Sequence, residues 1–321
     1  MLELRGVRKH FPITGGVFLR PTGWIKAVDG VDLSVDAGQT VGLVGESGCG
    51  KSTLGRLIVR LQDPSEGSIL FEGKDLAALD EKAMFGYRRA IQIVFQDPYS
   101  SLNPRMRVGR ILAEPLRIHL GLGGGELKRE VRTLLDSVGL PAAAKDRFPH
   151  EFSGGQRQRI GIARALALKP RLIVCDEPVS ALDVSIQAQI LNLLQDLQQQ
   201  FGLSYLFISH DLSVVRHMSD RIAVMYLGRI VELADGAELF AAPRHPYTRA
   251  LMAAAPLPDP RANAEVASLE GAVPSAANPP PGCHFHPRCV HAQERCRTAP
   301  APQLDALAPG HWVRCWRAGE I

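Results

Sequence analysis

One short segment constrains the fold of this chain more than any other. Residues 39–53 read QTVGLVGESGCGKST, a β-rich run that is broken by glycines. The apolar residues after it recur at helical spacing, namely Leu54, Leu57, Ile58 and Leu61. The segment therefore predicts a strand, a tight loop and a helix in direct succession.

The loop of this segment matches the phosphate-binding pattern G-x-x-x-x-G-K-[ST]. Glycines let backbone N–H groups converge on an anion at a helix N-terminus, where unpaired donors and the helix dipole both favour phosphate. Lys51 is expected to reach the β- and γ-phosphates, Ser52 to hold a magnesium ion, and Thr53 to assist at the phosphates. We interpret Cys49 as a small residue that faces away from the phosphates. The predicted nucleotide-binding residues of the loop are Gly45, Glu46, Ser47, Gly48, Cys49, Gly50, Lys51, Ser52 and Thr53.

Two further apolar runs end in polar residues. Residues 171–177 read RLIVCDE, and a continuous apolar run is typical of a strand buried on both faces of a parallel sheet. At its carboxyl end we expect Asp176 to hold magnesium through water and Glu177 to polarise the water that attacks the γ-phosphate. Cys175 is interpreted as a core thiol. The run at 204–209 is followed by His210, which would point into the same crevice and sense or orient the γ-phosphate.

Composition narrows the class of protein and its compartment. Hydrophobic residues make up 45% of the 321 residues and charged residues 22%, which is typical of a soluble globular chain. A net charge of +4 without a basic stripe does not indicate a nucleic-acid partner. There is no signal-peptide core and no apolar run long enough to span a membrane, so we expect the chain to remain in the cytoplasm with reduced thiols.

A second helix start is predicted between the first two strands. Phe152 precedes the run Ser-Gly-Gly-Gln, and apolar positions follow at Ile160, Ile162, Ala163 and Leu166. Serine and glycines at a helix start make another phosphate-binding N-terminus, one that the chain's own nucleotide does not need.

Together these motifs resemble those of the ATP-binding cassette ATPases over about residues 1–250. In that family two cassettes pair head to tail, and the signature of one closes over the ATP of the other. The resemblance implies that the signature acts on a partner's ATP through Ser153, Gly154, Gly155, Gln156 and Asp183. It also implies a catalytic and magnesium-binding role for Gln96, the general base at Glu177, and adenine stacking on Phe11 or, alternatively, Trp24.

The resemblance implies an α/β fold, that of a P-loop NTPase cassette. Its parts are a RecA-like mixed sheet core, an N-terminal antiparallel β subdomain and an inserted helical subdomain at about 97–165. Leu127, Val131, Leu134, Leu135 and Val138 predict an amphipathic helix there, and residues 97–104 are expected to form a loop. A small Cys-rich extension at 251–321 follows the cassette at 1–250.

The extension begins with a Pro- and Ala-rich stretch at 257–282, which has the composition of an extended linker. It leads to four of the six cysteines, Cys283, Cys289, Cys296 and Cys315. Their spacing follows neither the paired pattern of most zinc sites nor that of ferredoxins. The HPYTRAL run at 245–251 and the GCHFHPRC run at 282–289 resemble the C-terminal extension of oligopeptide and dipeptide importer ATPases, which implies a [4Fe–4S] cluster on the four thiolates. Zinc, with His286 or His291 substituting for a thiolate, and unmetallated thiols remain alternatives.

The resulting expectation is an ATPase subunit of a peptide importer, closest to the F-type subunit of that branch. It would use ATP and Mg²⁺ and pair with a paralogous ATPase subunit as a heterodimer. Two transmembrane permease subunits and, indirectly, an extracytoplasmic solute-binding protein complete the expected assembly, on the cytoplasmic side of a bacterial inner membrane. The alternatives are an importer of nickel or another small solute, and a soluble cassette protein of a lyase or repair complex.

Overall fold

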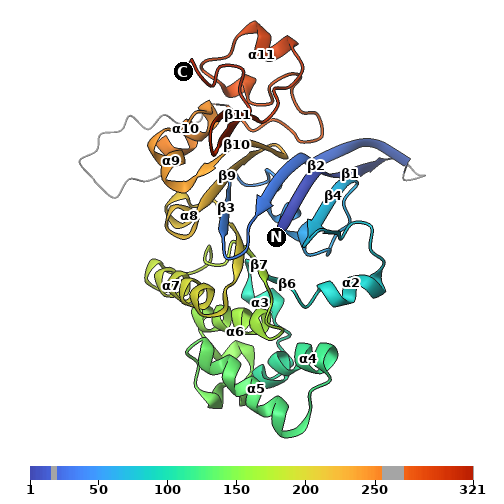
Figure 1. The fold of residues 1–321 in the computed structure, drawn as a ribbon, viewed down its shortest axis with the longest axis vertical. Coiled ribbons are helices and arrows are strands. Elements are labelled where there is room, and N and C mark those ends of the chain that lie inside the picture. The colour runs from blue at the N-terminus through green and yellow to red at the C-terminus, as the bar shows by residue number, and fades with distance from the viewer. Residues whose placement is uncertain (16–19, 255–270, 321) are drawn as a thin grey trace. The chain divides into compact units, whose positions relative to one another are not determined.

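The computed structural model describes residues 1–15, 20–254 and 271–320. Its chain divides into two compact units: unit 1 contains Met1–Ser34, Thr40–Ala77 and Ser209–Ile321, and unit 2 contains Val35–Gln39 and Ala78–Ile208. Figure 1 labels the helices and strands of both. Within the described ranges, no helix combines the length and the apolar character needed to cross a membrane.

Unit 1 begins with an antiparallel sheet in the order β2-β1-β4-β5. Leu2 pairs with Phe71 and Leu4 with Ile69, and all four side chains are buried, whereas the intervening Glu3 is exposed. This alternation is the period-two pattern of a sheet with one buried face. The strands are β1 (Leu2–Gly15), β2 (Arg20–Val35), β4 (Glu66–Phe71) and β5 (Lys74–Asp75).

The second sheet of unit 1 is mixed. β3 (Thr40–Val44) runs parallel to β9 (Arg221–Tyr226), and β9 pairs antiparallel with β10 (Arg229–Asp235). The sheet continues through β12 (His311–Val313) to β11 (Asp305–Ala308), so the end of the chain adds two strands to it.

Along the chain of unit 1, α1 follows β3, α8 precedes β9, and α9 follows β10. α8 packs closely on β3, because a Cβ at Gly42 would lie 2.3 Å from Val215 Cγ1. The helices of unit 1 are α1 (Lys51–Ile58), α8 (Leu212–Met218), α9 (Gly236–Ala241), α10 (Pro246–Ala253) and α11 (Glu294–Thr298), with a 3-10 turn at His286–Arg288.

Unit 2 contains three parallel strands whose residues are almost all buried. β6 (Ile91–Val94) pairs with β7 (Leu172–Asp176), and β7 pairs with β8 (Ser204–Ile208). The helices are α2 (Glu81–Tyr87), α3 (Pro98–Ser101), α4 (Val108–Leu120), α5 (Gly124–Ser137), α6 (Gly154–Leu166) and α7 (Val184–Phe201), with 3-10 turns at Ala142–Asp146 and Pro149–Glu151. The predicted amphipathic helix is α5, whose apolar face is buried.

Two local predictions were wrong. Leu61 lies beyond the end of α1 and is 57% exposed, so the helix and its buried stripe stop at Ile58. The stretch 97–104, predicted as loop, contains the one-turn helix α3. Proline suits the first position of a helix, and the Asp97 carboxylate accepts a hydrogen bond from the N–H of Tyr99 at 2.8 Å, which caps the turn.

Part of the predicted linker, residues 257–270, lies outside the described residues. The part that follows contacts β2, since the Ala276 carbonyl accepts a hydrogen bond from the N–H of Lys26 at 3.0 Å. The end of this stretch is therefore held against β2.

Candidate functional site

The phosphate-binding loop of unit 1 links β3 to α1. A Cβ at Gly45 would lie 2.2 Å from the carbonyl oxygen of Met225, and one at Gly50 would lie 2.0 Å from that of Ala27. Both glycines also have positive φ, 153° and 109°. Any side chain at either position would collide with a backbone oxygen, so the backbone course of the loop requires glycine there.

Lys51 is buried in this loop at the start of α1. Its Nζ donates hydrogen bonds to the carbonyl oxygens of Gly45, at 2.7 Å, and Glu46, at 3.0 Å. Ser47 and Gly48 are exposed, and Ser52 and Thr53 are partly exposed in the first turn of the helix. The backbone of the loop thus holds the amine that was predicted to reach the phosphates.

Cys49 is 4% exposed. Burial raises the pKa of its thiol, and the neighbouring amine of Lys51, 3.9 Å from Sγ, offsets this only in part. The thiol is therefore protonated and enclosed at neutral pH, as a small residue packed under the loop would be.

Glu46 has partners that the sequence did not predict. Its backbone N–H donates to the hydroxyl oxygen of Tyr247 at 2.9 Å. Arg288 donates to both oxygens of its carboxylate, at 2.7 and 2.9 Å. Both partners come from the C-terminal part of the chain, about two hundred residues away, and no local pattern marks them.

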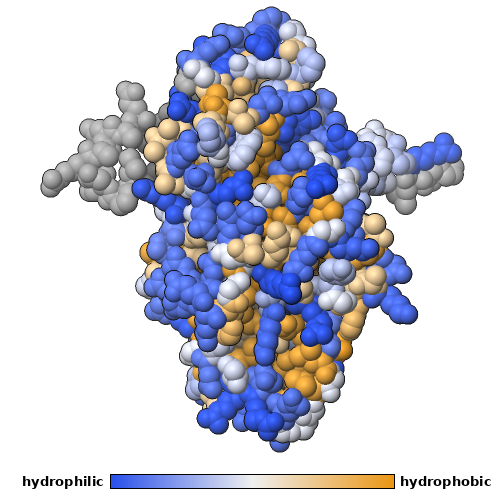
Figure 2. All heavy atoms as spheres, in the orientation of Figure 1, coloured by the Kyte–Doolittle hydropathy of each residue, from blue (hydrophilic) through white to orange (hydrophobic). Residues whose placement is uncertain are grey.

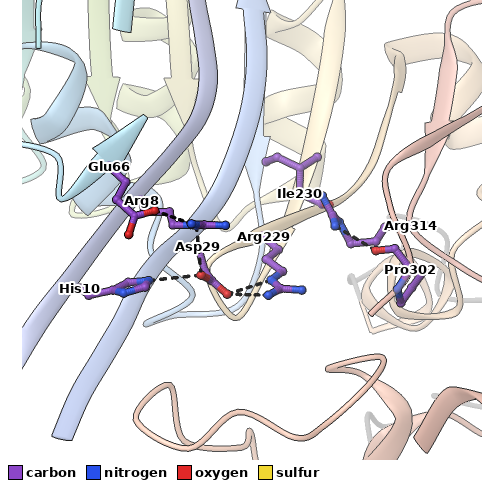
Figure 3. Close-up of polar contacts among 8 residues, drawn as sticks. All are labelled: Arg8, His10, Asp29, Glu66, Arg229, Ile230, Pro302 and Arg314. Carbon is purple, nitrogen blue, oxygen red and sulfur yellow. Dashed lines mark hydrogen bonds and ion pairs between the residues drawn. The ribbon is translucent and has the colours of Figure 1, made fainter. Parts of the chain in front are cut away.

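The buried acid Asp29 links β1, β2 and the start of β10 (Figure 3). Asp29 of β2 accepts two hydrogen bonds from Arg229, at 3.0 and 2.7 Å, and lies 3.2 Å from His10 Nε2. Burial acts to raise the pKa of Asp29, but the guanidinium of Arg229 and the other partners outweigh it, so the pKa is lowered and the carboxylate stays charged. Beside it, Arg314 donates to the carbonyl of Ile230 at 2.8 Å, which fixes the tail to β10.

The two aromatic candidates for adenine stacking lie on the paired strands β1 and β2. Phe11 is partly buried, with Lys9 Nζ 5.2 Å from its ring centroid, and Trp24 is 49% exposed. His210 is exposed directly after β8, at the end where Asp211 caps α8. These three positions stay predictions.

In unit 2 the carboxyl end of β7 carries the predicted acids. Asp176 is buried, and Glu177 is partly exposed with φ +46°. A non-glycine residue in the left-handed region is uncommon, and such residues cluster at functional sites. The Gln96 amide donates to the Glu177 carboxylate at 2.9 Å, so unit 2 brings together two of the three residues predicted to be catalytic.

The predicted signature forms a capped helix start in unit 2. The Ser153 hydroxyl accepts from the N–H of Gln156 at 3.4 Å, and the Gln156 side chain accepts from the N–H of Ser153 at 3.1 Å. This reciprocal pair is a capping box. A Cβ at Gly155 would lie 2.4 Å from Ile186 Cγ2, so this glycine is also required by packing against α7. Asp183 is exposed at the N-terminus of α7.

The four C-terminal cysteines line a single cavity of about 20 Å³. Burial raises the pKa of the Cys283 thiol to about 11, and the other three thiols add to this. Four soft sulfur donors at one cavity fit the chemistry of a thiolate-bound metal group. Within the described ranges, however, no group of three or more His, Cys, Asp or Glu side chains is arranged so that it could hold a metal ion.

Three features define a P-loop ATPase of the cassette class. They are the phosphate loop between β3 and α1, the acids at the carboxyl end of β7, and the glycines at the start of α6. The ABC transporter family matches residues 28–180, and the family described as the C-terminal region of oligopeptide/dipeptide transporters matches residues 231–296. The chain belongs to the ATP-binding subunits of ABC transporters, and it is an ATPase of that family.

Relatives and a solved structure support this assignment. The chain is 54% identical over 318 residues to the oligopeptide transport ATP-binding protein AppF of Bacillus subtilis, covering 98% of this chain and 96% of the relative. It is 48% identical over 316 residues to the dipeptide transport ATP-binding protein DppF of Haemophilus influenzae, with coverage of 98% and 96%. A dimeric post-hydrolysis structure of the ATP-binding cassette MJ0796 bound to ADP and Pi matches with a TM-score of 0.66 and 30% identity, over 73% of this chain and 98% of that one. The predicted fold class is thereby confirmed.

Proposed function

We propose that this chain hydrolyses ATP to power the import of oligopeptides or dipeptides through a membrane transporter. Its relatives are named for the transport of these solutes. The observation that carries the hydrolytic assignment is Glu177, which follows a buried strand in a strained backbone conformation and is hydrogen-bonded by Gln96.

In this mechanism Glu177 accepts a proton from the attacking water as the water adds to the γ-phosphate in line with the leaving oxygen. Gln96 orients the carboxylate of Glu177. Lys51 and the backbone N–H groups of the phosphate loop spread the charge that builds up on the transferred group. His210 contacts the γ-phosphate, and Phe11 or Trp24 stacks on the adenine.

Oxygen donors of the chain fit a magnesium ion, which prefers hard ligands. We assign Ser52, Gln96 and Asp176 to this role. Asp176 is 3% exposed and offers carboxylate oxygens, the ligands that this ion prefers, at the carboxyl end of β7. When bound, the ion would neutralise charge on the β- and γ-phosphate oxygens.

We further propose that Ser153, Gly154, Gly155, Gln156 and Asp183 act on the ATP of a paralogous ATPase subunit in a heterodimer. Support comes from the N-terminus of α6, where the helix dipole favours an anion, and from the exposure of Asp183. The ATP-binding cassette MJ0796 is dimeric in its solved structure.

The further partners would be two membrane-spanning permease subunits. This chain would then lie at the cytoplasmic face of a bacterial membrane, and a solute-binding protein would lie on the other side. Hydrophobic side chains gather in the lower part of the face drawn in Figure 2, near α4, above a lowest end that is mostly hydrophilic. Unit 2 exposes Phe85, Ile118 and Leu120, and the Phe85 ring stacks on His119 at 4.2 Å. Such surfaces suit a partner protein.

We propose that the cassette ends and the C-terminal extension begins at about residue 250. Within the extension, we propose that a [4Fe–4S] cluster is held by Cys283, Cys289, Cys296 and Cys315. The support is the cavity that all four thiols line and their soft donor chemistry. A bound cluster would cross-link the turns of the extension. Iron and sulfide at about four each in anaerobically purified protein, lost when the four cysteines are replaced by serine, would agree with this. Stoichiometric zinc, or no metal, would contradict it.

The hydrolytic assignment is tested with Glu177→Gln in the transporter assembled from its permease and ATPase subunits. We expect ATP binding to be retained and turnover to fall by about a hundredfold or more, the usual contribution of a general base. Glu126→Gln, on the exposed surface of α5, is the matched control. Unchanged turnover in Glu177→Gln would remove this residue from its role. Failure of the chain to purify with two multi-span membrane proteins would contradict the transporter assignment.

A further inference from the structure

Glu46 of the phosphate loop is held at three points by other parts of unit 1. Its carboxylate receives both Arg288 donors, and its N–H donates to Tyr247 Oη. Its carbonyl oxygen accepts from Lys51 Nζ at 3.0 Å and from the N–H of Cys49 at 3.3 Å. Glu46 therefore connects groups of the C-terminal region directly to the amine that binds phosphate.

The Arg288 contact is suited to fixing geometry. The side chain of Arg288 is 4% exposed and that of Glu46 is 22% exposed, so the pair is largely removed from solvent. A guanidinium that donates twice to one carboxylate sets both its distance and its plane. The contact therefore fixes where the Glu46 side chain lies as well as compensating its charge.

The second contact is supported by aromatic packing. Tyr247 is fully buried, and its ring lies 5.4 Å from Phe285 and 4.7 Å from Tyr226. Phe285 and Arg288 both belong to the segment between Cys283 and Cys289. One short turn of the extension thus supplies the guanidinium and also packs against the tyrosine.

The extension itself is anchored elsewhere in unit 1. Arg314 donates to the Ile230 carbonyl and, at 3.0 Å, to that of Pro302 (Figure 3). His311 lies 2.8 Å from the fully buried Glu232. The extension, which carries Phe285 and Arg288, is therefore fixed to β10 through β12 and Arg314.

We propose that Arg288 and Tyr247 are positioning residues of the ATP site: they hold Glu46 so that its carbonyl and the loop backbone place Lys51 for the phosphates. The C-terminal extension thereby sets the affinity of the loop for ATP. This inference rests on the ATPase activity, and it adds that the cassette's own phosphate loop is completed by the extension.

The test is titration of the full chain with a fluorescent ATP analogue and Mg²⁺. We expect Arg288→Ala to weaken binding about tenfold, the usual effect of losing a hydrogen bond to a charged group. Tyr247→Phe removes only the hydroxyl, keeps the ring against Phe285, and should weaken binding several-fold. Arg288→Lys should recover part of the loss. Arg297→Ala, an exposed arginine of the same extension, should bind as the wild type does.

A double-mutant cycle separates positioning from general damage to the extension. If Arg288 acts through Glu46, then Glu46→Ala and the double variant should bind equally well, because the second change has nothing left to remove. Loss in the double variant equal to the product of the single losses would overturn the proposal. So would wild-type affinity in both Arg288→Ala and Tyr247→Phe. Absence of binding by the wild-type chain would instead count against the ATPase assignment.

Discussion

Gly155 offers the sharpest test of why the signature contains glycine. A Cβ at this position would lie 2.4 Å from Ile186 Cγ2, whereas one at Gly154 would lie 3.2 Å from Leu182 Cδ2. Ile186 is branched at Cβ, so its methyl moves only if χ1 changes or α7 shifts. Leu182 Cδ2 is the end of a longer side chain and yields more easily. Alanine should therefore be tolerated at 154 and rejected at 155.

The magnitude follows from two opposing effects. Overpacking a close contact costs about 1–3 kcal/mol. Replacing glycine by alanine in a helix gains at most about 1 kcal/mol. We expect Gly155→Ala to lose about 1–2 kcal/mol and Gly154→Ala to be close to neutral. With about 2–4 °C per kcal/mol, the midpoint of thermal unfolding should fall by several degrees only for the first variant.

The assay compares thermal unfolding of Gly154→Ala, Gly155→Ala and Ile186→Ala with that of Gly155→Ala/Ile186→Ala. Ile186→Ala removes the clashing methyl and leaves a Cβ at 3.8 Å, an ordinary contact. The double variant should thus lose less stability than the two single losses added together, by about 1 kcal/mol. Equal midpoints for the two glycine variants, or simple additivity in the double variant, would refute the packing argument. A double variant that folds well but does not turn over ATP would show that Gly155 is needed for the partner's nucleotide as well.

Three further predictions concern buried groups of unit 1. Burial lowers the pKa of His245 to about 3, while the unfolded chain takes up a proton near 6.5. The free energy of unfolding should therefore fall by about 1.4 kcal/mol per pH unit as the pH drops below 6.5. His245→Asn keeps an acceptor for the N–H of Tyr247 and should flatten this slope when the free energy is measured by urea unfolding. An unchanged slope in His245→Asn would contradict the prediction. His311→Ala leaves the Glu232 carboxylate without its imidazole and should cost about 3 kcal/mol, and a loss below about 1 kcal/mol would show that the pair is dispensable. Because burial raises the pKa of the Cys49 thiol, iodoacetamide at pH 8 should label Cys49 only after denaturation. Rapid labelling of Cys49 itself in the native chain would place this thiol at the surface.

Features set by neighbouring residues could be predicted from the sequence. Gly45, Lys51 and Ser52 lie in one short motif, and the strand before Asp176 is a continuous apolar run. The capped start of α6 follows from a serine before two glycines, since capping depends on residues within one turn. These elements were predicted because their physical causes are local.

Contacts between distant residues could not be predicted in this way. Arg288 and Glu46 are 242 positions apart, and His311 and Glu232 are 79 apart. An arginine next to a cysteine and a glutamate inside a loop carry no signal of each other until the fold places them together. The same holds for Gly155: the sequence predicts it to be a signature residue, but its close approach to Ile186 depends on how α6 and α7 pack.

The phosphate loop of unit 1 is confined by unrelated parts of the chain. The Met225 carbonyl of β9 excludes a side chain at Gly45, and the Ala27 carbonyl of β2 excludes one at Gly50. Tyr247 and Arg288 fix Glu46 from the C-terminal side. A loop restrained in this way has its N–H donors oriented before phosphate arrives, so little reorganisation is needed on binding. Changes at any of these supports should therefore act first on the affinity for ATP and only secondarily on the rate of its hydrolysis.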